Sequence, residues 1–148
     1  MKKFFITALA AIAIGTSAFA APTTVSKYVS ANFAASFAKA KNVTWKSNDK
    51  FDMVSFVIDN EQLNAFYGTD GELIGTSKTF AFDKLPKSAL ETITTKYTFP
   101  EYQLQDCIEF VNSANEKNYY VSFGKKNESV VLEINRSGIV SVFSKTRK

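Results

Sequence analysis

The apolar residues follow a helical period and then a strand period, and this order occurs twice along the chain. In residues 26–41, Val29, Phe33 and Phe37 recur every four positions, which predicts a helix with one apolar stripe that Ser26 can cap. Apolar and polar residues then alternate in short runs that favour strands. These runs lie at residues 42–47, 51–59, 62–67 and 73–80.

The second half of the chain shows the same order. Pro86 suits the first turn of a helix, in which Leu90, Ile93 and Tyr97 follow at spacings of three and four. Pro100 ends this helix, because a proline pushes the residue before it out of helical geometry. Further strands are predicted at residues 102–111, 119–123, 129–135 and 139–143.

Short identical stretches recur 67 residues apart. They lie in strand-like segments whose apolar and polar positions alternate in the same order. They are Val54-Ser55-Phe56 with Val121-Ser122-Phe123, Asn60-Glu61 with Asn127-Glu128, and Gly71 with Gly138. A fixed period with a shared parity indicates one structural unit used twice. We therefore predict an α+β fold with two αββββ repeats, at about residues 26–80 and 84–145. The repeats would form one antiparallel sheet of about eight strands, with both helices on one face.

The strand parity also predicts which side of the sheet faces the helices. Val54 and Phe56 share one face of their strand, and Val121 and Phe123 take the equivalent places in the second half. We expect these side chains to pack beneath the helices. Turn chemistry predicts hairpin connections at Asp59-Asn60-Glu61, Asp70-Gly71 and Arg136-Ser137-Gly138.

The opposite face of the predicted sheet is too apolar for a surface that water covers. Alternation places Val57 and Phe66 there from the first half, and Tyr120 and Val131 from the second. Aromatic anchors are typical of binding hot spots, and exposed apolar patches mark partner sites. These four residues form the predicted partner-binding site. The alternative is that sheet twist, loops or the N-terminal segment cover them, or that the parity is misassigned.

Residues 1–20 have the pattern of a signal peptide, with two lysines, an apolar run at residues 4–14 and a small-x-small site before Ala21. The run is too short to cross a bilayer. We therefore expect a soluble bacterial protein, periplasmic or secreted, with one domain at residues 21–148 and no stable membrane insertion after cleavage. Losing the two lysines lowers the formal charge from +4 to +2. No concentrated basic face remains, which argues against nucleic-acid binding.

The residue types exclude several kinds of catalytic site. The sequence contains no His and one Cys, so it lacks the commonest general base, any Ser–His or Cys–His nucleophile pair, and a Cys and His zinc site. Asp70-Gly71-Glu72 lacks the spacing of a calcium loop, and we expect no cofactor or metal. A Ser–Lys pair or a pair of carboxylates stays open, but the acidic residues lie mostly at predicted turns. We expect no enzymatic activity.

Cys107 is the only cysteine, so no disulfide can form within the chain. Alternation groups it with Gln103, Gln105 and Glu109, on the more polar face of its predicted strand. An inert, partly covered thiol is the favoured interpretation. An intermolecular disulfide or a thiol sensor is the alternative.

Several short motifs of the first half occur in a recognisable order. They are Ala40-Lys41-Asn42-Val43-Thr44-Trp45, Val54-Ser55-Phe56, Ala65-Phe66-Tyr67-Gly68-Thr69-Asp70-Gly71-Glu72, and Leu85-Pro86 opening a helix that ends in Ile93-Thr94-Thr95-Lys96-Tyr97. This pattern resembles the PepSY-like, beta-lactamase-inhibitor-like family of exported bacterial proteins. The motifs cover most of residues 26–97, while the second half matches more loosely and lacks the Trp and the Asp-Gly turn. The resemblance implies a tandem helix-plus-sheet fold, and the family's name implies protein binding or inhibition.

Together these patterns predict an exported, non-enzymatic protein-binding module, such as an inhibitor or sensor of an envelope or secreted enzyme. Its partner would be a protein or peptide that the sequence does not identify. A structural or self-assembling envelope protein is the alternative, and a hydrolase that works without His is a third.

Overall fold

The computed structural model describes residues 25–147, so the predicted signal segment at residues 1–20 lies outside the described residues. Eight strands form one antiparallel sheet in chain order. The first half contains α2 (Lys27–Ser36), β1 (Lys41–Ser47), β2 (Phe51–Ile58), β3 (Glu61–Gly68) and β4 (Leu73–Thr79). The second half contains η1 (Phe82–Lys84), α3 (Lys87–Lys96), β5 (Gln103–Asn112), β6 (Lys117–Lys125), β7 (Glu128–Asn135) and β8 (Val140–Arg147). The predicted α+β fold with one eight-stranded sheet and two helices is confirmed.

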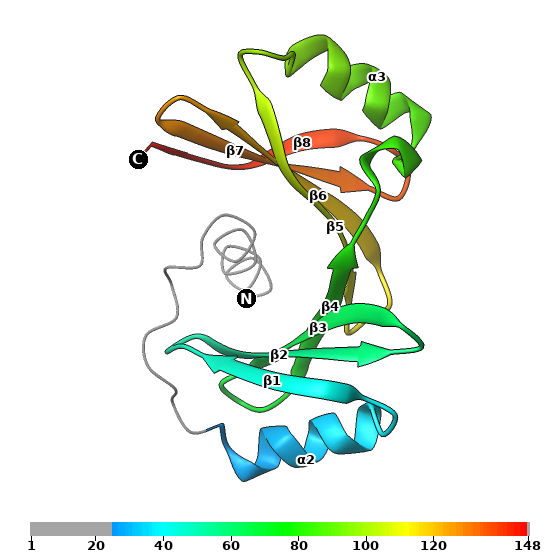
Figure 1. Ribbon diagram of the computed structural model, residues 1–148, viewed down its shortest axis with the longest axis vertical. Helices are drawn as coiled ribbons and strands as arrows, with labels where there is room; N and C mark the ends of the chain where they lie inside the picture. The colour runs from blue at the N-terminus through cyan, green and yellow to red at the C-terminus, as the bar shows by residue number, and fades with distance from the viewer. Residues whose placement is uncertain (1–24, 148) are drawn as a thin grey trace.

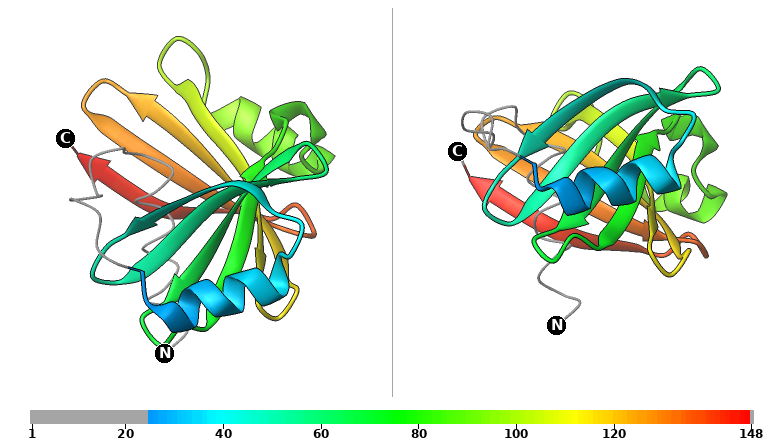
Figure 2. Two further views of the ribbon diagram at one scale, coloured as in Figure 1. Left: turned by 60° about the horizontal axis from the view of Figure 1, so that its bottom comes forward. Right: turned by 90° about the horizontal axis from the view of Figure 1, so that it is seen from below.

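The sheet curls into an open arc, and α2 and α3 both lie on its outer side (Figure 1). Figure 2 shows α2 crossing the strands of the first half on that side. Register shifts between β1 and β2, β3 and β4, β5 and β6, and β7 and β8 add local bends to the ordinary twist of the sheet. We call the helix-bearing side the outer face, with Val54, Phe56, Val121 and Phe123, and the concave side the inner face, with Met53, Phe66, Phe110, Tyr120 and Val131.

Both helices begin close to where the sequence places them. The Ser26 hydroxyl caps α2 by accepting a hydrogen bond of 3.2 Å from the Val29 amide. The helix ends at Ser36 instead of the expected residue 41. Its last turn closes when the Phe37 amide donates to the Phe33 carbonyl, and the chain then turns into β1. Within residues 25–147, neither helix is long and apolar enough to span a membrane.

The predicted hairpin turns are confirmed by the backbone geometry. Asp59 and Asn60 both have positive φ, at 51° and 64°, as a two-residue type I′ connection between β2 and β3 requires. Gly71 and Gly138 have φ of 82° and 83° in the turns that follow β3 and β7. In each of these turns the glycine amide donates to the carbonyl three residues earlier.

The outer face buries the core beneath the helices, as strand parity predicted. Val54, Phe56 and Val121 are fully buried, and Phe123 is 4% exposed. Between α2 and the sheet, Val29 and Phe33 of the helix pack against Ala65 and Tyr67. Between α3 and the sheet, Ala89 and Ile93 of the helix pack with Leu85, Val130, Leu132 and Ile134.

Each helix also contacts the positive-φ glycine of the last turn in its own half. The Asn32 amide donates to the Gly71 carbonyl at 3.1 Å, and the Ser88 hydroxyl donates to the Gly138 carbonyl at 3.4 Å. A β-carbon at Gly71 would lie 2.4 Å from the Tyr28 ring, so the helix needs a glycine there to approach so closely.

We predict that Gly71→Ala and Gly138→Ala each lower the free energy of unfolding by about 1–3 kcal/mol. Each substitution forces a β-carbon into a strained left-handed conformation and against the first turn of a helix. Urea denaturation of the mature chain measures the loss. Gly68→Ala is the control, because Gly68 does not have a positive φ and its β-carbon would meet only the end of the Asp70 side chain, not a helix. Equal stability of the Gly68 and Gly71 variants would contradict the prediction.

Candidate functional site

The structure places three of the four predicted partner-binding residues together. Phe66, Tyr120 and Val131 lie on the inner face, in one apolar cluster with Met53 and Phe110. Their side chains are buried, with exposed fractions of 2%, 4% and 0%. The parity assigned from the sequence is correct, but the expectation that these three side chains are exposed is wrong. They pack against one another in this cluster on the concave side of the sheet.

A row of aromatic rings runs across the inner face. Phe51 contacts Phe66, Phe66 contacts Phe110, Phe110 contacts Tyr120, and Tyr120 contacts Phe143, with centroid separations of 6.1, 6.2, 6.4 and 5.2 Å. These separations lie within or close to the range in which ring pairs attract each other beyond the burial of their area. The row therefore joins strands of both halves of the sheet.

Gly75 in β4 allows the two halves of this row to meet. It lies opposite Phe66, and a β-carbon on it would come within 2.5 Å of the Phe110 ring. Without a side chain on β4 at this point, the rings on β3 and β5 contact each other across the strand between them. The sequence offers only an isolated glycine in a strand pattern as a signal of this close approach.

Two inner-face hydroxyls lack partners among the described residues. The side-chain oxygens of Ser122 and Ser129 are buried, and neither has a hydrogen bond there. Ser122 lies opposite Val131, and Ser129 lies two residues before it on the same face. Within residues 25–147, both hydroxyls are therefore unpaired and buried beside the apolar cluster, which costs free energy of folding.

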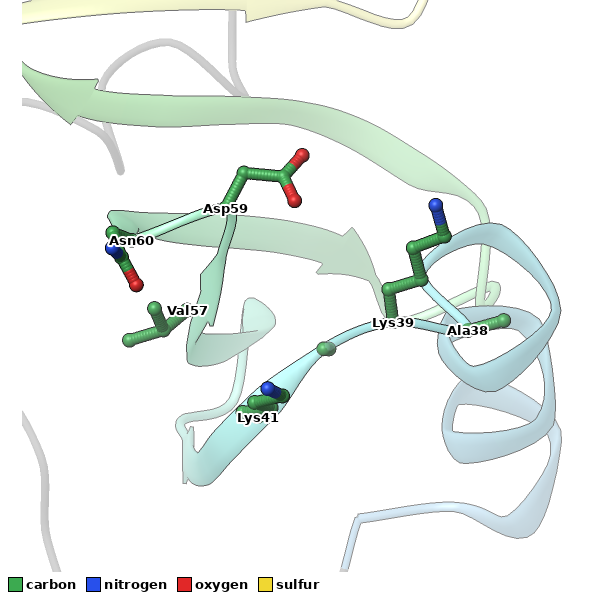
Figure 3. Close-up of a pocket in the computed structure, with 7 residues that line it drawn as sticks. Ala38, Lys39, Lys41, Val57, Asp59 and Asn60 are labelled. Atoms are coloured by element: carbon green, nitrogen blue, oxygen red, sulfur yellow. The ribbon is translucent and has the colours of Figure 1, made fainter.

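Val57, the fourth predicted residue, lies away from this cluster at a cavity of about 670 Å³. The cavity lies between the segment that joins α2 to β1 and the turn between β2 and β3, and Figure 3 shows Lys39 and Asp59 reaching toward it from opposite sides. Val57 is half-buried, so it is the predicted residue that a partner can reach. The remaining lining residues are Ala38, Ala40, Lys41 and Asn60.

A second cavity, of about 340 Å³, opens at the end of the inner face. The turns at residues 68–72 and 112–116 lie side by side there, since the Ser113 amide donates to the Ile74 carbonyl at 3.0 Å. Leu73, Ile74, Phe110 and Tyr120 supply its apolar lining, and its polar lining includes Asp70, Glu72, Asn112, Glu116 and Asn118.

The hydrogen bonds beside this cavity fix several of its polar groups. The Tyr120 hydroxyl and the Asn118 amide both donate to one oxygen of Glu133, at 2.9 and 2.8 Å. Burial, together with the neighbouring Glu133 carboxylate, raises the pKa of Tyr120, so this phenol stays protonated and acts as a donor. The Asn112 amide donates to Glu116 at 2.7 Å. From the sequence, Asp70 and Glu72 were turn residues that lack the spacing of a calcium loop, and their place at this cavity was missed because nothing local places β5 and β6 beside them.

Cys107 lies in the core beneath α3, not on a polar face. It pairs with Val121 on the outer face, and its side chain is 5% exposed. Glu109, on the same face, is also buried and forms a salt bridge of 3.1 Å with Lys117. The predicted polar face was wrong because α3 covers the middle of this strand, which the polar residues of the strand do not indicate. Burial, with a smaller effect from Asp106, raises the pKa of the thiol to about 12.

Several solved structures from Bacteroides species share this fold. A DUF2874 family protein from Bacteroides uniformis matches with a TM-score of 0.67 and 9% identity, over 84% of this chain and 90% of that chain. A candidate periplasmic protein from Bacteroides eggerthii matches with a TM-score of 0.67 and 12% identity, over 84% and 90%. A BLIP-like protein from Bacteroides fragilis matches with a TM-score of 0.62 and 11% identity, over 86% and 89%.

At these identities the likeness establishes the fold alone, which is therefore a BLIP-like fold. No protein-family model matches the chain, and no curated protein matches it. The inhibitor-like part of the expected resemblance is confirmed at the level of fold, while the PepSY-like part stays a prediction.

We predict that Cys107 reacts with Ellman's reagent in the folded chain at pH 8 at least about a hundredfold more slowly than in urea. The reason is that burial disfavours the reactive thiolate. The folded chain binds the thiol proton more tightly than the unfolded chain does. The protonated Cys107 therefore contributes its full share of stability below pH 9.0, and this share declines as the pH rises toward about 12. Release of one thiol per chain in urea is the control. Equal rates in the folded and unfolded chain would show an accessible thiol.

Proposed function

We propose that the protein is an exported, non-enzymatic binding module whose partner is a protein that docks against the inner face of the sheet. The observation that carries this proposal is the row of aromatic rings on the face that carries no described helix. Soluble domains normally cover or solvate the second face of an antiparallel sheet. Here that face has an apolar floor of packed, buried rings, and half-buried side chains border it, in the manner of an interface with a central anchor cluster.

Half-buried residues around this floor are the groups that a partner would touch first. They are Ser55, Val57, Asn64, Ile108, Asn118 and Glu133. An apolar centre with a polar rim is the usual arrangement of a protein interface.

The fold neighbours support this proposal at a coarser level. One is a BLIP-like protein and another is a candidate periplasmic protein. An inhibitor or sensor of an envelope or secreted enzyme is the role that fits both the fold and the predicted signal peptide. Proteins of one fold often differ in function, so the partner must be identified by experiment.

We also propose that the chain arose from two αββββ units and belongs with PepSY-like proteins. The helix–glycine contacts at Gly71 and Gly138, and the register shifts at the first and third pairings of each half, support this view. Two similar units would place two copies of the same outer core around one shared inner face.

Self-association is the second candidate function, and the exposed edge strand β8 favours it. Its neighbourhood carries Ile139 and Val142, which are 65% and 58% exposed. Unpaired edge strands readily pair with another chain. An assembling envelope protein would use this edge, whereas the binding module would use the inner face.

We predict that a photoreactive benzoylphenylalanine at Val57 or Asn118 crosslinks a distinct protein in cells that export the full chain, whereas the same group at Glu91 does not. The first two positions lie on the inner face, and Glu91 is exposed on α3. Mass spectrometry of the crosslinked species identifies the partner. Crosslinks only between copies of the chain would favour self-association. Equal crosslinking from all three positions would contradict inner-face docking.

Substitution of Phe66 or Tyr120 by Ser does not provide this test. Both rings are buried, so removing one would create a cavity and cost about 3–5 kcal/mol of stability. Loss of binding in such a variant would report unfolding as readily as a lost contact. Val57→Asp changes a half-buried position and is the better variant for weakening a partner.

A further inference from the structure

The cavity between the turns at residues 68–72 and 112–116 combines an apolar floor with acidic side chains. Its lining contains the carboxylates of Asp70, Glu72 and Glu116 and no Lys or Arg. All three acidic residues are exposed. Glu133 adds a further carboxylate directly behind the Tyr120 hydroxyl.

The apolar part of the same cavity is preformed. The Phe110 and Tyr120 rings contact each other and are held in the inner-face row, while Ile74 and Leu73 are half-buried beside them. Gly75 removes the side chain that would otherwise displace the Phe110 ring. The volume of about 340 Å³ lies at the low end of the range for ligand pockets, about 300–1,000 Å³, and suits one side chain better than a large cofactor.

We propose that this cavity receives the side chain of an arginine or lysine that a partner polypeptide presents to the inner face. This inference rests on the proposed binding function and names the chemistry that one subsite would recognise. The aliphatic stem of such a residue would cover Ile74 and Phe110, and its charged end would meet Glu72 and Glu116 at the exposed rim.

Charge decides between the alternative occupants. A phosphate or an acidic side chain would be repelled by the carboxylates at close range, and this repulsion is stronger near a protein surface than in bulk water. A purely apolar group would cover carboxylates without replacing the water that solvates them. A cation above aromatic rings gains attraction from both the carboxylates and the ring faces. The basic side chain therefore fits both parts of the cavity.

The test uses acetyl-arginine amide as the probe, with acetyl-citrulline amide as its neutral analogue of nearly equal shape. Amide chemical shifts of the isotopically labelled mature chain follow each titration. We expect saturable shifts confined to residues 70–75 and 110–120, with a dissociation constant in the millimolar range for arginine and at least about fivefold weaker binding for citrulline. Raising the salt concentration should weaken only the arginine titration.

A paired variant, Glu72→Gln with Glu116→Gln, should weaken arginine binding by about fivefold and leave citrulline binding unchanged. Glutamine at residue 116 can still accept the hydrogen bond from Asn112, so the turn is preserved. Glu91→Gln, on the exposed side of α3, removes one carboxylate elsewhere and should change neither titration.

Equal affinity for arginine and citrulline, shifts spread over the whole surface, or no saturable shifts would each overturn the basic-side-chain assignment. The proposed binding function would survive those results if the inner-face crosslinks still captured a partner. If the probe binds as expected but no inner-face crosslink forms, the preference of the cavity for a basic side chain stands, and docking of a partner across the inner face is wrong.

Discussion

The contact between Phe66 and Phe110 across β4 is the interaction on which the shape of the molecule depends. Together with the pairing of β4 with β5, this contact brings inner-face side chains of the two halves together. It exists because Gly75 has no side chain. The floor of the inner face and the cavity beside Tyr120 both depend on how closely these rings approach, and the contact holds the curled sheet together across β4.

This arrangement gives the two faces of the sheet different roles. The outer face is filled by helices that dock on the turns at Gly71 and Gly138, so it is a conventional core. The inner face is apolar as well, but no described helix covers it (Figure 1). The proposed docking site combines this buried apolar floor with the half-buried side chains that border it, and the acidic cavity at its end would add selectivity for charge.

The strand pattern was enough to predict most of the fold. Period-two alternation placed Val54, Phe56, Val121 and Phe123 on the helix-facing side, and turn chemistry located Asp59-Asn60 and Gly138. What it could not predict depends on contacts between distant strands. The burial of Phe66, Tyr120 and Val131 requires the curl of the sheet, and the burial of Cys107 requires α3 to lie over β5. The acidic cavity was missed because its two turns are about forty residues apart and meet only through the pairing of β4 and β5.

A double-mutant cycle on Phe66→Leu and Phe110→Leu tests the central claim most directly. Leucine keeps each position apolar and removes the ring, and urea denaturation gives the free energy of unfolding of each variant. If the rings join the two halves, the two losses should be coupled by about 0.5–1.5 kcal/mol, as for other contacting aromatic pairs. Losses that add to within about 0.3 kcal/mol would show that the rings act independently and that another interaction curls the sheet.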